Sequence, residues 1–238
     1  IQILLTSFLI SSGILRTDGR IIINDDNEKV ILKGFGLGGW LVLEGYMWNF
    51  PGFGSTTTME NAVIDLLGEQ KADLFFERYR SNYITEKDIS FLAESGFNAL
   101  RVPLHYKHFS PSFNEFTDLG FDLLEPIINA CRDNDMYVVL DMHAAPGAQN
   151  TSDFSDSDEQ EARLFTQYSN QKWYVSTWRY IAEHYADEPV VAAYDLLNEP
   201  VLPWGYGPPA LRNLYEWAID SIRMVDPDHI VIIEGNWF

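Results

Sequence analysis

Apolar, strand-like runs alternate with amphipathic helical segments along nearly the whole chain, and this alternation constrains the fold more than any other feature. Each run is almost continuously apolar, which is typical of parallel strands covered on both faces, and the helices between them indicate β-α-β connections. The sequence therefore predicts an α/β fold with a parallel sheet. The predicted strands are 35–43, 97–104, 136–143, 190–200 and 230–235, and the predicted helices are 83–95, 119–135, 171–189 and 209–229.

Two architectures fit this order, a doubly wound sheet and a (β/α)-barrel. No strand is followed by a G-x-G-x-x-G run that opens a helix, and the nearest glycine cluster, residues 34–39, lies before or within a strand. Polar residues stand just past or within each apolar run, where barrel enzymes place their active sites. This favours the barrel. The residues are Glu44, Arg101, His143, Asn198, Glu199 and Glu234.

The N-terminal region has two parts. Residues 1–16 begin with an apolar stretch followed by small residues, which predicts the remnant of a secretion signal and a secreted or periplasmic protein. An ordinary buried strand or helix start is the alternative. Residues 20–34 place an Asp/Asn turn between two β-branched runs and predict a β-hairpin. We expect one domain to occupy residues 17–238.

The composition excludes several classes of protein. A chain of 238 residues with 46% hydrophobic residues fits one large domain. Its formal charge of −19 argues against nucleic acid as a partner, and no run reaches the roughly 20 apolar residues of a membrane span. The single cysteine, Cys131, excludes an intrachain disulfide and is predicted to be a buried structural thiol.

An amide beside a carboxylate, in a cleft with Arg and His, fits proton transfer to a sugar leaving group. Glycoside hydrolysis needs one carboxylic acid that is protonated near neutral pH and a second carboxylate as nucleophile or base. Asn198 is suited to hydrogen-bond the sugar 2-hydroxyl. Aromatic side chains near the strand ends can stack on pyranose rings. The candidates are Trp40, Trp48, Trp204 and Trp237, of which Trp204 is favoured.

Structural roles compete with these functional ones. Arg101 could be an ion-pair partner, His143 could be held by a backbone carbonyl, and Glu234 could be a supporting carboxylate. His105 and His108 lack an H-E-x-x-H frame or a third matched ligand, so the sequence predicts no metal site.

Four stretches carry a resemblance to a known family. They are residues 38–47, 96–104, 138–150 and 194–200, the last reading "YDLLNEP". Together they resemble glycoside hydrolase family 5, in the branch of the exo-β-1,3-glucanases and bacterial secreted cellulases. The resemblance covers about residues 17–238 and implies a (β/α)8 barrel that hydrolyses β-glycosidic bonds with retention, without a metal or organic cofactor.

The resemblance also implies residue roles. Glu199 would be the general acid/base, with Asn198 on the substrate hydroxyl and Arg101 and His143 supporting the centre. Glu44 would reach a sugar hydroxyl in the subsite before the cleaved bond. Asp153 would add a substrate contact, although "TSD" at 151–153 departs from the family's Gly-aromatic pair before the aspartate. Trp237 is also predicted to contact substrate, from its position after the last predicted strand and not from the resemblance.

Only the first five strands of the eight-stranded barrel are expected here, so the chain resembles an N-terminal fragment that is poorly soluble or inactive alone. The family's nucleophilic glutamate follows strand seven and is expected beyond Phe238. Glu234 would approach from the wrong side to replace it.

The predicted partner is a β-linked polysaccharide or oligosaccharide, bound by an enzyme that is monomeric at full length. β-Glucan is favoured as the substrate over β-mannan. A non-catalytic carbohydrate-binding barrel, an inactive fragment and an acidic α/β enzyme of unrelated chemistry remain as alternatives.

Overall fold

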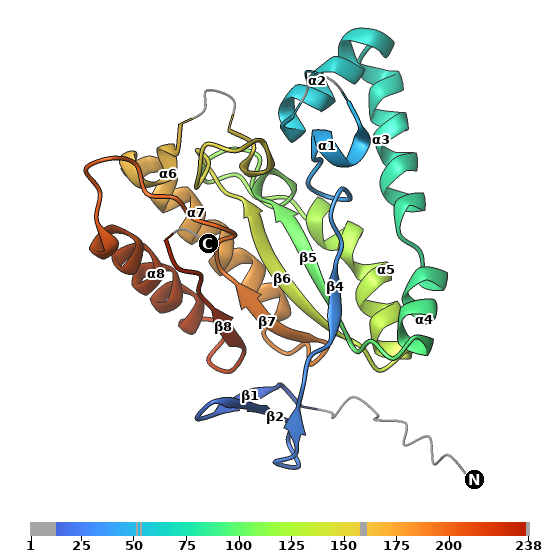
Figure 1. Cartoon of the computed structure of the whole chain (residues 1–238), viewed down its shortest axis with the longest axis vertical. Helices are drawn as coiled ribbons and strands as arrows, with labels where there is room; N and C mark the ends of the chain where they lie inside the picture. The colour runs from blue at the N-terminus through green and yellow to red at the C-terminus, as the bar shows by residue number, and fades with distance from the viewer. Residues whose placement is uncertain (1–12, 51, 53, 158–160, 237–238) are drawn as a thin grey trace.

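The centre of the molecule is a five-stranded parallel sheet (Figure 1). The computed structural model describes residues 13–50, 52, 54–157 and 161–236. The strands pair strictly in chain order, as in a (β/α)8 barrel, whereas a doubly wound sheet reverses its order partway. The prediction of about five barrel units is confirmed. The strands are β4 (Gly34–Gly36), β5 (Ala99–His105), β6 (Tyr137–Ala144), β7 (Val191–Asp195) and β8 (Ile230–Ile232).

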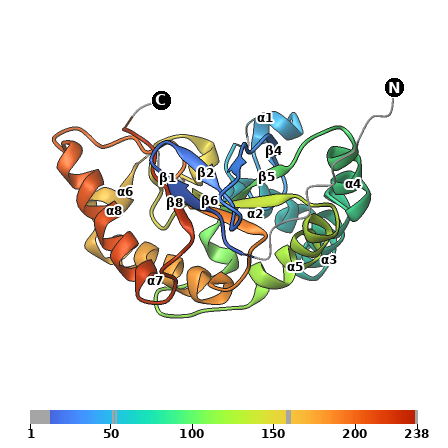
Figure 2. The ribbon, with the colours of Figure 1, turned by 90° about the horizontal axis from the view of Figure 1, so that it is seen from below.

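Four helices cover the outer face of the sheet in an arc (Figure 2). All four were expected, three of them within four residues of their observed bounds, while the last was predicted to end at 229 and ends at Arg223. Their apolar stripes pack on the strand residues that point outward, such as Leu100, Val138 and Tyr194, and form the main core. The helices are α4 (Glu86–Glu94), α5 (Leu119–Asp133), α7 (Tyr168–Tyr185) and α8 (Pro208–Arg223).

A second group of short elements lies around the carboxyl ends of the strands (Figure 1). The sequence patterns did not predict them. The longest are the helices α2 and α3, whose buried side chains Met59 and Phe76 pack with Leu43 in a small separate core. These elements are α1 (Gly45–Trp48), α2 (Thr56–Leu67), α3 (Glu69–Tyr83), η1 (Tyr106–His108), η2 (Asp153–Ser155) and α6 (Arg163–Thr166).

A small antiparallel sheet lies at the lower end of the parallel sheet (Figures 1 and 2). It consists of β1 (Arg16–Asp18), β2 (Ile21–Ile23) and β3 (Lys29–Val30), so the predicted hairpin is present with one additional strand. Leu15 is fully buried beside inward-facing strand residues. Most of the predicted signal segment, residues 1–12, lies outside the described residues. The second core comprises Leu15, Tyr137, Val139, Ala192 and Ala193, packed by Ile22, Val30, Leu32 and Ile230.

Three predicted strands are wrong in extent. The first, expected over 35–43, is only Gly34–Gly36, and residues 40–44 form a buried loop instead. The fourth, expected over 190–200, ends at Asp195. The fifth, expected over 230–235, is only Ile230–Ile232. The errors in the first and fourth strands have the same cause. Leu196 and Leu197 are apolar because they are buried, and burial in a loop gives the same sequence signal as burial in a strand.

Candidate active site

The inner face of the sheet changes from apolar to charged toward the carboxyl ends of the strands. Val139 and Ala193 pack against the hairpin, and the next inward residues on the same strands are Asp141 and Asp195, which are paired in register. Arg101 projects from the neighbouring strand β5. Five predicted site residues gather around these three: Glu44, His143, Asn198, Glu199 and Glu234.

Arg101 contacts four other side chains of the site. Its Nε and Nη2 donate to Asp195 Oδ2 at 2.9 and 2.8 Å, and its Nη1 lies 3.0 Å from Asp141 Oδ2. Nη2 also reaches Asn198 Oδ1 and Glu234 Oε1, each at 3.0 Å. These carboxylates hold the pKa of Arg101 above its ordinary value despite its burial. Arg101 therefore pairs with carboxylates, as the structural alternative expected, and through the same guanidinium contacts the predicted site residue Asn198.

His143 is held by a carboxylate and not by the backbone carbonyl considered from sequence. Its Nδ1 lies 2.7 Å from Asp141 Oδ2, and because a carboxylate only accepts, Nδ1 is the donor. Arg101 Nη2 donates to Asn198 Oδ1 and so turns Asn198 Nδ2 toward His143 Nε2, at 3.5 Å. The orientation of the predicted substrate-binding amide is therefore fixed from two sides.

Glu199 occupies an unusual backbone conformation at the turn after β7. Its φ of 45° lies in the left-handed region, which a non-glycine residue adopts only when neighbours hold it there. Its N–H donates to Glu234 Oε2 at 2.7 Å, and its carbonyl accepts from Asn150 Nδ2 at 2.9 Å. Gln149 Nε2 donates to the carbonyl of Asn198 at 3.0 Å. The loop after β6 thereby supports both residues of the pair.

Glu234 has a supporting position. One carboxylate oxygen accepts from Arg101 and the other from the Glu199 N–H, while its own carbonyl accepts from the Tyr215 hydroxyl at 3.0 Å. Of the roles considered from sequence, the geometry matches the supporting carboxylate.

The sequence patterns missed four residues of this site: Asp141, Asp195, Gln149 and Asn150. Asp141 and Asp195 sit inside strands, where they interrupt apolar runs, and an acidic residue within a buried strand is the signal that could have identified them. Burial, followed by the nearby Asp141 carboxylate, raises the pKa of Asp195 to about 6, although Arg101 opposes the shift.

Glu44 lies at one side of the site in a pocket of about 320 Å³. Its side chain is only 6% exposed, and burial raises its pKa while His143 opposes the change. Asp153, the other predicted sugar contact in this region, also lines the pocket. The pocket is lined by Glu44, Gly45, Tyr46, Gly54, Ser152, Asp153 and Phe154.

The tryptophans predicted near the strand ends have different surroundings. Trp40 is buried and donates its Nε1–H to the Arg80 carbonyl, and Trp48 packs on Tyr79, so both belong to the core. Trp204 is 100% exposed in the loop after Glu199, where a sugar can reach it. Trp237 lies outside the described residues.

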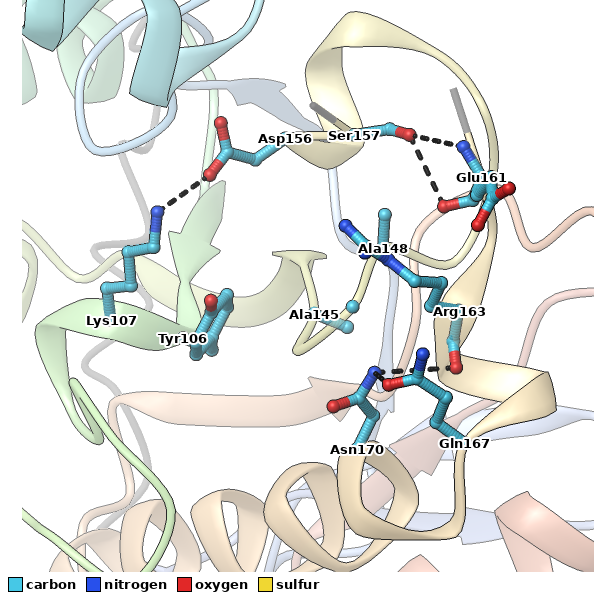
Figure 3. Close-up of a pocket in the computed structure, with 11 residues that line it drawn as sticks. Tyr106, Lys107, Ala145, Ala148, Asp156, Ser157, Glu161, Arg163, Gln167 and Asn170 are labelled. Carbon is cyan, nitrogen blue, oxygen red and sulfur yellow. Dashed lines mark hydrogen bonds and ion pairs between the residues drawn. The ribbon is translucent and has the colours of Figure 1, made fainter. Parts of the chain in front are cut away.

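A second, strongly polar pocket of about 200 Å³ lies beside the site (Figure 3). Lys107 and Asp156 line it on one side, where their side chains form an ion pair of 3.0 Å, and Asn170 and Gln167 line it on the other. Asp156 also binds His105, one of the two loop histidines noted from sequence.

In the part of the chain that the structure describes, no group of three or more His, Cys, Asp or Glu residues could hold a metal ion. Within those same residues, no helix is long and apolar enough to cross a membrane. Cys131 is buried and burial raises its pKa to about 12, which confirms a structural thiol.

Comparisons with known proteins were made for both sequence and structure. A family model described as cellulase (glycosyl hydrolase family 5) matches residues 59–238. A β-xylosidase from Phanerodontia chrysosporium is 33% identical over 226 residues, which cover 94% of this chain and 46% of that protein. A probable glucan 1,3-β-glucosidase A from Neosartorya fischeri is 32% identical over 211 residues, covering 87% of this chain and 50% of that protein. The chain thus spans about half the length of the curated relatives it matches.

Solved structures give the same fold. The endoglucanase Cel5A of Pseudomonas stutzeri matches with 26% identity and a TM-score of 0.51, over 63% of this chain and 43% of that one. A rutinosidase from Aspergillus niger matches with a TM-score of 0.73 at 17% identity, over 87% of this chain and 63% of that one, and this likeness concerns the fold alone.

Proposed function

The chain belongs to glycosyl hydrolase family 5, and from this premise we propose that the protein containing it hydrolyses β-glucan, cellulose or β-1,3-glucan, with retention of configuration. The observation that carries the proposal is the Asn198–Glu199 pair, with Asn198 held by Arg101 and the backbone of Glu199 held by Glu234 and Asn150. An acid that protonates a leaving group needs this kind of fixed placement.

In the proposed reaction, Glu199 donates its proton to the glycosidic oxygen as the bond to the sugar breaks. A second carboxylate, from a part of the protein outside these 238 residues, attacks the anomeric carbon and forms a glycosyl-enzyme. Glu199 then takes a proton from water, which hydrolyses this intermediate. Asn198 binds the 2-hydroxyl, where a hydrogen bond strengthens in the transition state.

Glu44 and Asp153 are proposed to bind hydroxyl groups of one sugar from opposite sides of the 320 Å³ pocket. Trp204 is proposed as a stacking surface for a sugar beyond the cleaved bond, because it is fully exposed in the loop that follows Glu199. The protein is proposed to be secreted or periplasmic and to act as a monomer, as the sequence patterns predict.

Glucan is favoured by several relatives named glucan 1,3-β-glucosidase, and a xyloside is the second candidate because the relative with 33% identity is named a β-xylosidase. Measuring hydrolysis of β-1,3-glucan, cello-oligosaccharides, β-mannan and aryl β-glucosides and β-xylosides separates these substrates. The anomer first released, observed by NMR, tests retention. A first product of inverted configuration contradicts the proposed mechanism.

We predict that Glu199→Gln abolishes turnover of substrates with poor leaving groups, a loss of at least 10³-fold. Aryl glycosides with activated leaving groups need no protonation and should still form the glycosyl-enzyme, visible as a burst of released phenol. Glu183→Gln, an exposed change on α7, is the matched control and should be without effect. Equal losses on both classes of substrate would reject Glu199 as the acid.

A further inference from the structure

Asp156 is the most heavily hydrogen-bonded side chain near the Glu44 pocket, although it does not line that pocket. Its Oδ1 accepts from the N–H of Thr57 at 2.7 Å, and its Oδ2 accepts from the Thr57 hydroxyl at 2.6 Å. Oδ2 also lies 2.9 Å from His105 Nε2 and 3.0 Å from Lys107 Nζ. The Asp156 side chain is 4% exposed, so these four donors replace its water almost completely.

The roles of the donors follow from their partners. His105 Nδ1 accepts from the Lys107 N–H at 3.2 Å, so Nε2 carries the hydrogen and donates to Asp156. Burial alone would raise the pKa of Asp156, but the His105 and Lys107 groups hold it far below its ordinary value. Asp156 is therefore a carboxylate throughout the pH range in which enzymes work.

These bonds join three separate loops at the carboxyl ends of the strands. Thr57 is in the first turn of α2, His105 and Lys107 end β5 and open η1, and Asp156 closes η2 after β6. Thr57 and Asp156 are 99 residues apart in the chain. Figure 3 shows Lys107 and Asp156 facing each other between these loops. We call Asp156 and its three partner residues the Asp156 clamp.

The clamp connects the two walls of the Glu44 pocket. Asp153 and Phe154 stand in η2, directly before Asp156, and form one wall. Glu44 and Tyr46 form the other wall, which is tied to α2 because the Thr56 hydroxyl and the Leu43 backbone exchange hydrogen bonds of 2.9 and 3.2 Å.

The two walls are in close contact at Gly54 and Asp153. A methyl group placed on Gly54 would lie 1.7 Å from the Asp153 carboxylate. The Gly54 carbonyl accepts from the Gly45 N–H at 3.0 Å, in the wall that carries Glu44. The separation of the walls therefore depends on how closely α2 is held to η2, and Asp156 makes that connection.

We propose that Asp156 is a positioning residue that sets the width of the Glu44 pocket, and thereby the affinity for the sugar bound between Glu44 and Asp153. The inference rests on the proposed function for the identity of the ligand. Among the described residues Asp156 bonds to Thr57, His105 and Lys107 and not to Arg101 or Glu199, so its loss should change KM and leave kcat almost unchanged.

The test compares two buried His–Asp pairs in the protein that contains this chain. Asp156→Asn places an amide donor among four donors and should break the clamp. Asp226→Asn is the matched control, because Asp226 is also buried, binds His229 Nδ1 at 2.7 Å and accepts from Tyr194, but lies between α8 and β8. Both variants should lower Tm. Only Asp156→Asn should raise KM, by at least tenfold, with kcat within threefold.

Thr57→Val is a milder second variant, since it removes the hydroxyl bond and retains the N–H bond to Asp156. We expect a KM increase of two- to fivefold. A KM unchanged in both Asp156→Asn and Thr57→Val, or raised equally by Asp226→Asn, overturns the proposal.

Hydrogen exchange separates this proposal from the proposed function. In Asp156→Asn, amides of residues 45–58 and 150–156 should exchange faster than in wild type, while Asp226→Asn should leave both segments unchanged. If wild type hydrolyses no β-glycoside, the proposed function fails and the exchange result still decides the clamp. If wild type is active and exchange in the two segments is unaffected, the clamp fails and the function stands.

Discussion

Among single residues, Arg101 explains why so many acidic groups can share the inner face of the sheet. Asp141, Asp195 and Glu234 all contact its guanidinium, which offers several donors in a fixed plane. Asp141 Oδ1 and Asp195 Oδ1 are nevertheless buried without a hydrogen-bond partner among the described residues. One guanidinium does not compensate all three carboxylates, which agrees with the raised pKa of Asp195.

This charge balance predicts a pH dependence of stability. The pKa of Asp195 is about 6 in the folded protein against 3.8 ordinarily, so the folded state binds its proton more tightly than the unfolded state. The free energy of unfolding should therefore fall as the pH rises from 4 to above 6, by on the order of 3 kcal/mol from this group. The Asp195→Asn variant lacks this titrating carboxyl, so its free energy of unfolding should depend less on pH.

Urea denaturation of wild type and Asp195→Asn at several pH values between 4 and 7.5 measures the difference. Groups common to both proteins cancel when the two curves are subtracted. Parallel curves would mean that Asp195 is already ionised at pH 4 in the folded state.

Among the elements, the α2–α3 pair shows how a segment with weak periodicity acquires a defined place. Ser55 caps α2, since its Oγ accepts from the Thr58 N–H at 3.3 Å while the Thr58 hydroxyl accepts from the Ser55 N–H at 3.1 Å. Tyr79 and Tyr83 on α3 donate to the carbonyls of Gly39 and Gly38. Local capping and long-range hydrogen bonds together fix this pair above the sheet.

We predict that Ser55→Ala lowers the free energy of unfolding by about 1 kcal/mol, the usual cost of losing an N-cap. Ser81→Ala is the control, because Ser81 is exposed on α3 and its hydroxyl bonds only within its own helix turn. Equilibrium unfolding in urea measures both. An equal loss in the two variants would show that the Ser55 cap contributes nothing specific.

At the scale of the whole molecule, the hairpin β1–β3 covers the apolar lower part of the inner face of the parallel sheet, as the helices cover its outer face. The sheet itself has β4 and β8 at its two edges among the described residues, and apolar side chains near them are exposed, such as Phe35 and Ile233. Such edges favour pairing with further strands. Poor solubility of this chain alone remains a prediction.

The packing of the hairpin predicts that Leu15→Ala costs about 2 to 5 kcal/mol, the range for removing a fully buried leucine side chain. Leu66→Ala, in which the leucine is 80% exposed, should change stability by less than about 0.5 kcal/mol. Thermal and urea unfolding measure the two variants. A small effect of Leu15→Ala would indicate that the hairpin does not close the lower end of the sheet in solution.

The sequence by itself determined the sheet, its four covering helices and the polar residues at the strand ends, because each depends on local periodicity or on position next to an apolar run. Only the tertiary structure placed Asp141 and Asp195 on Arg101, brought Glu234 to Arg101 and the Glu199 N–H, and brought Asp156 to Thr57. Those contacts join residues 35 to 133 positions apart on different strands and loops. No local pattern records such contacts, since they depend on which strands and loops the folded sheet brings together.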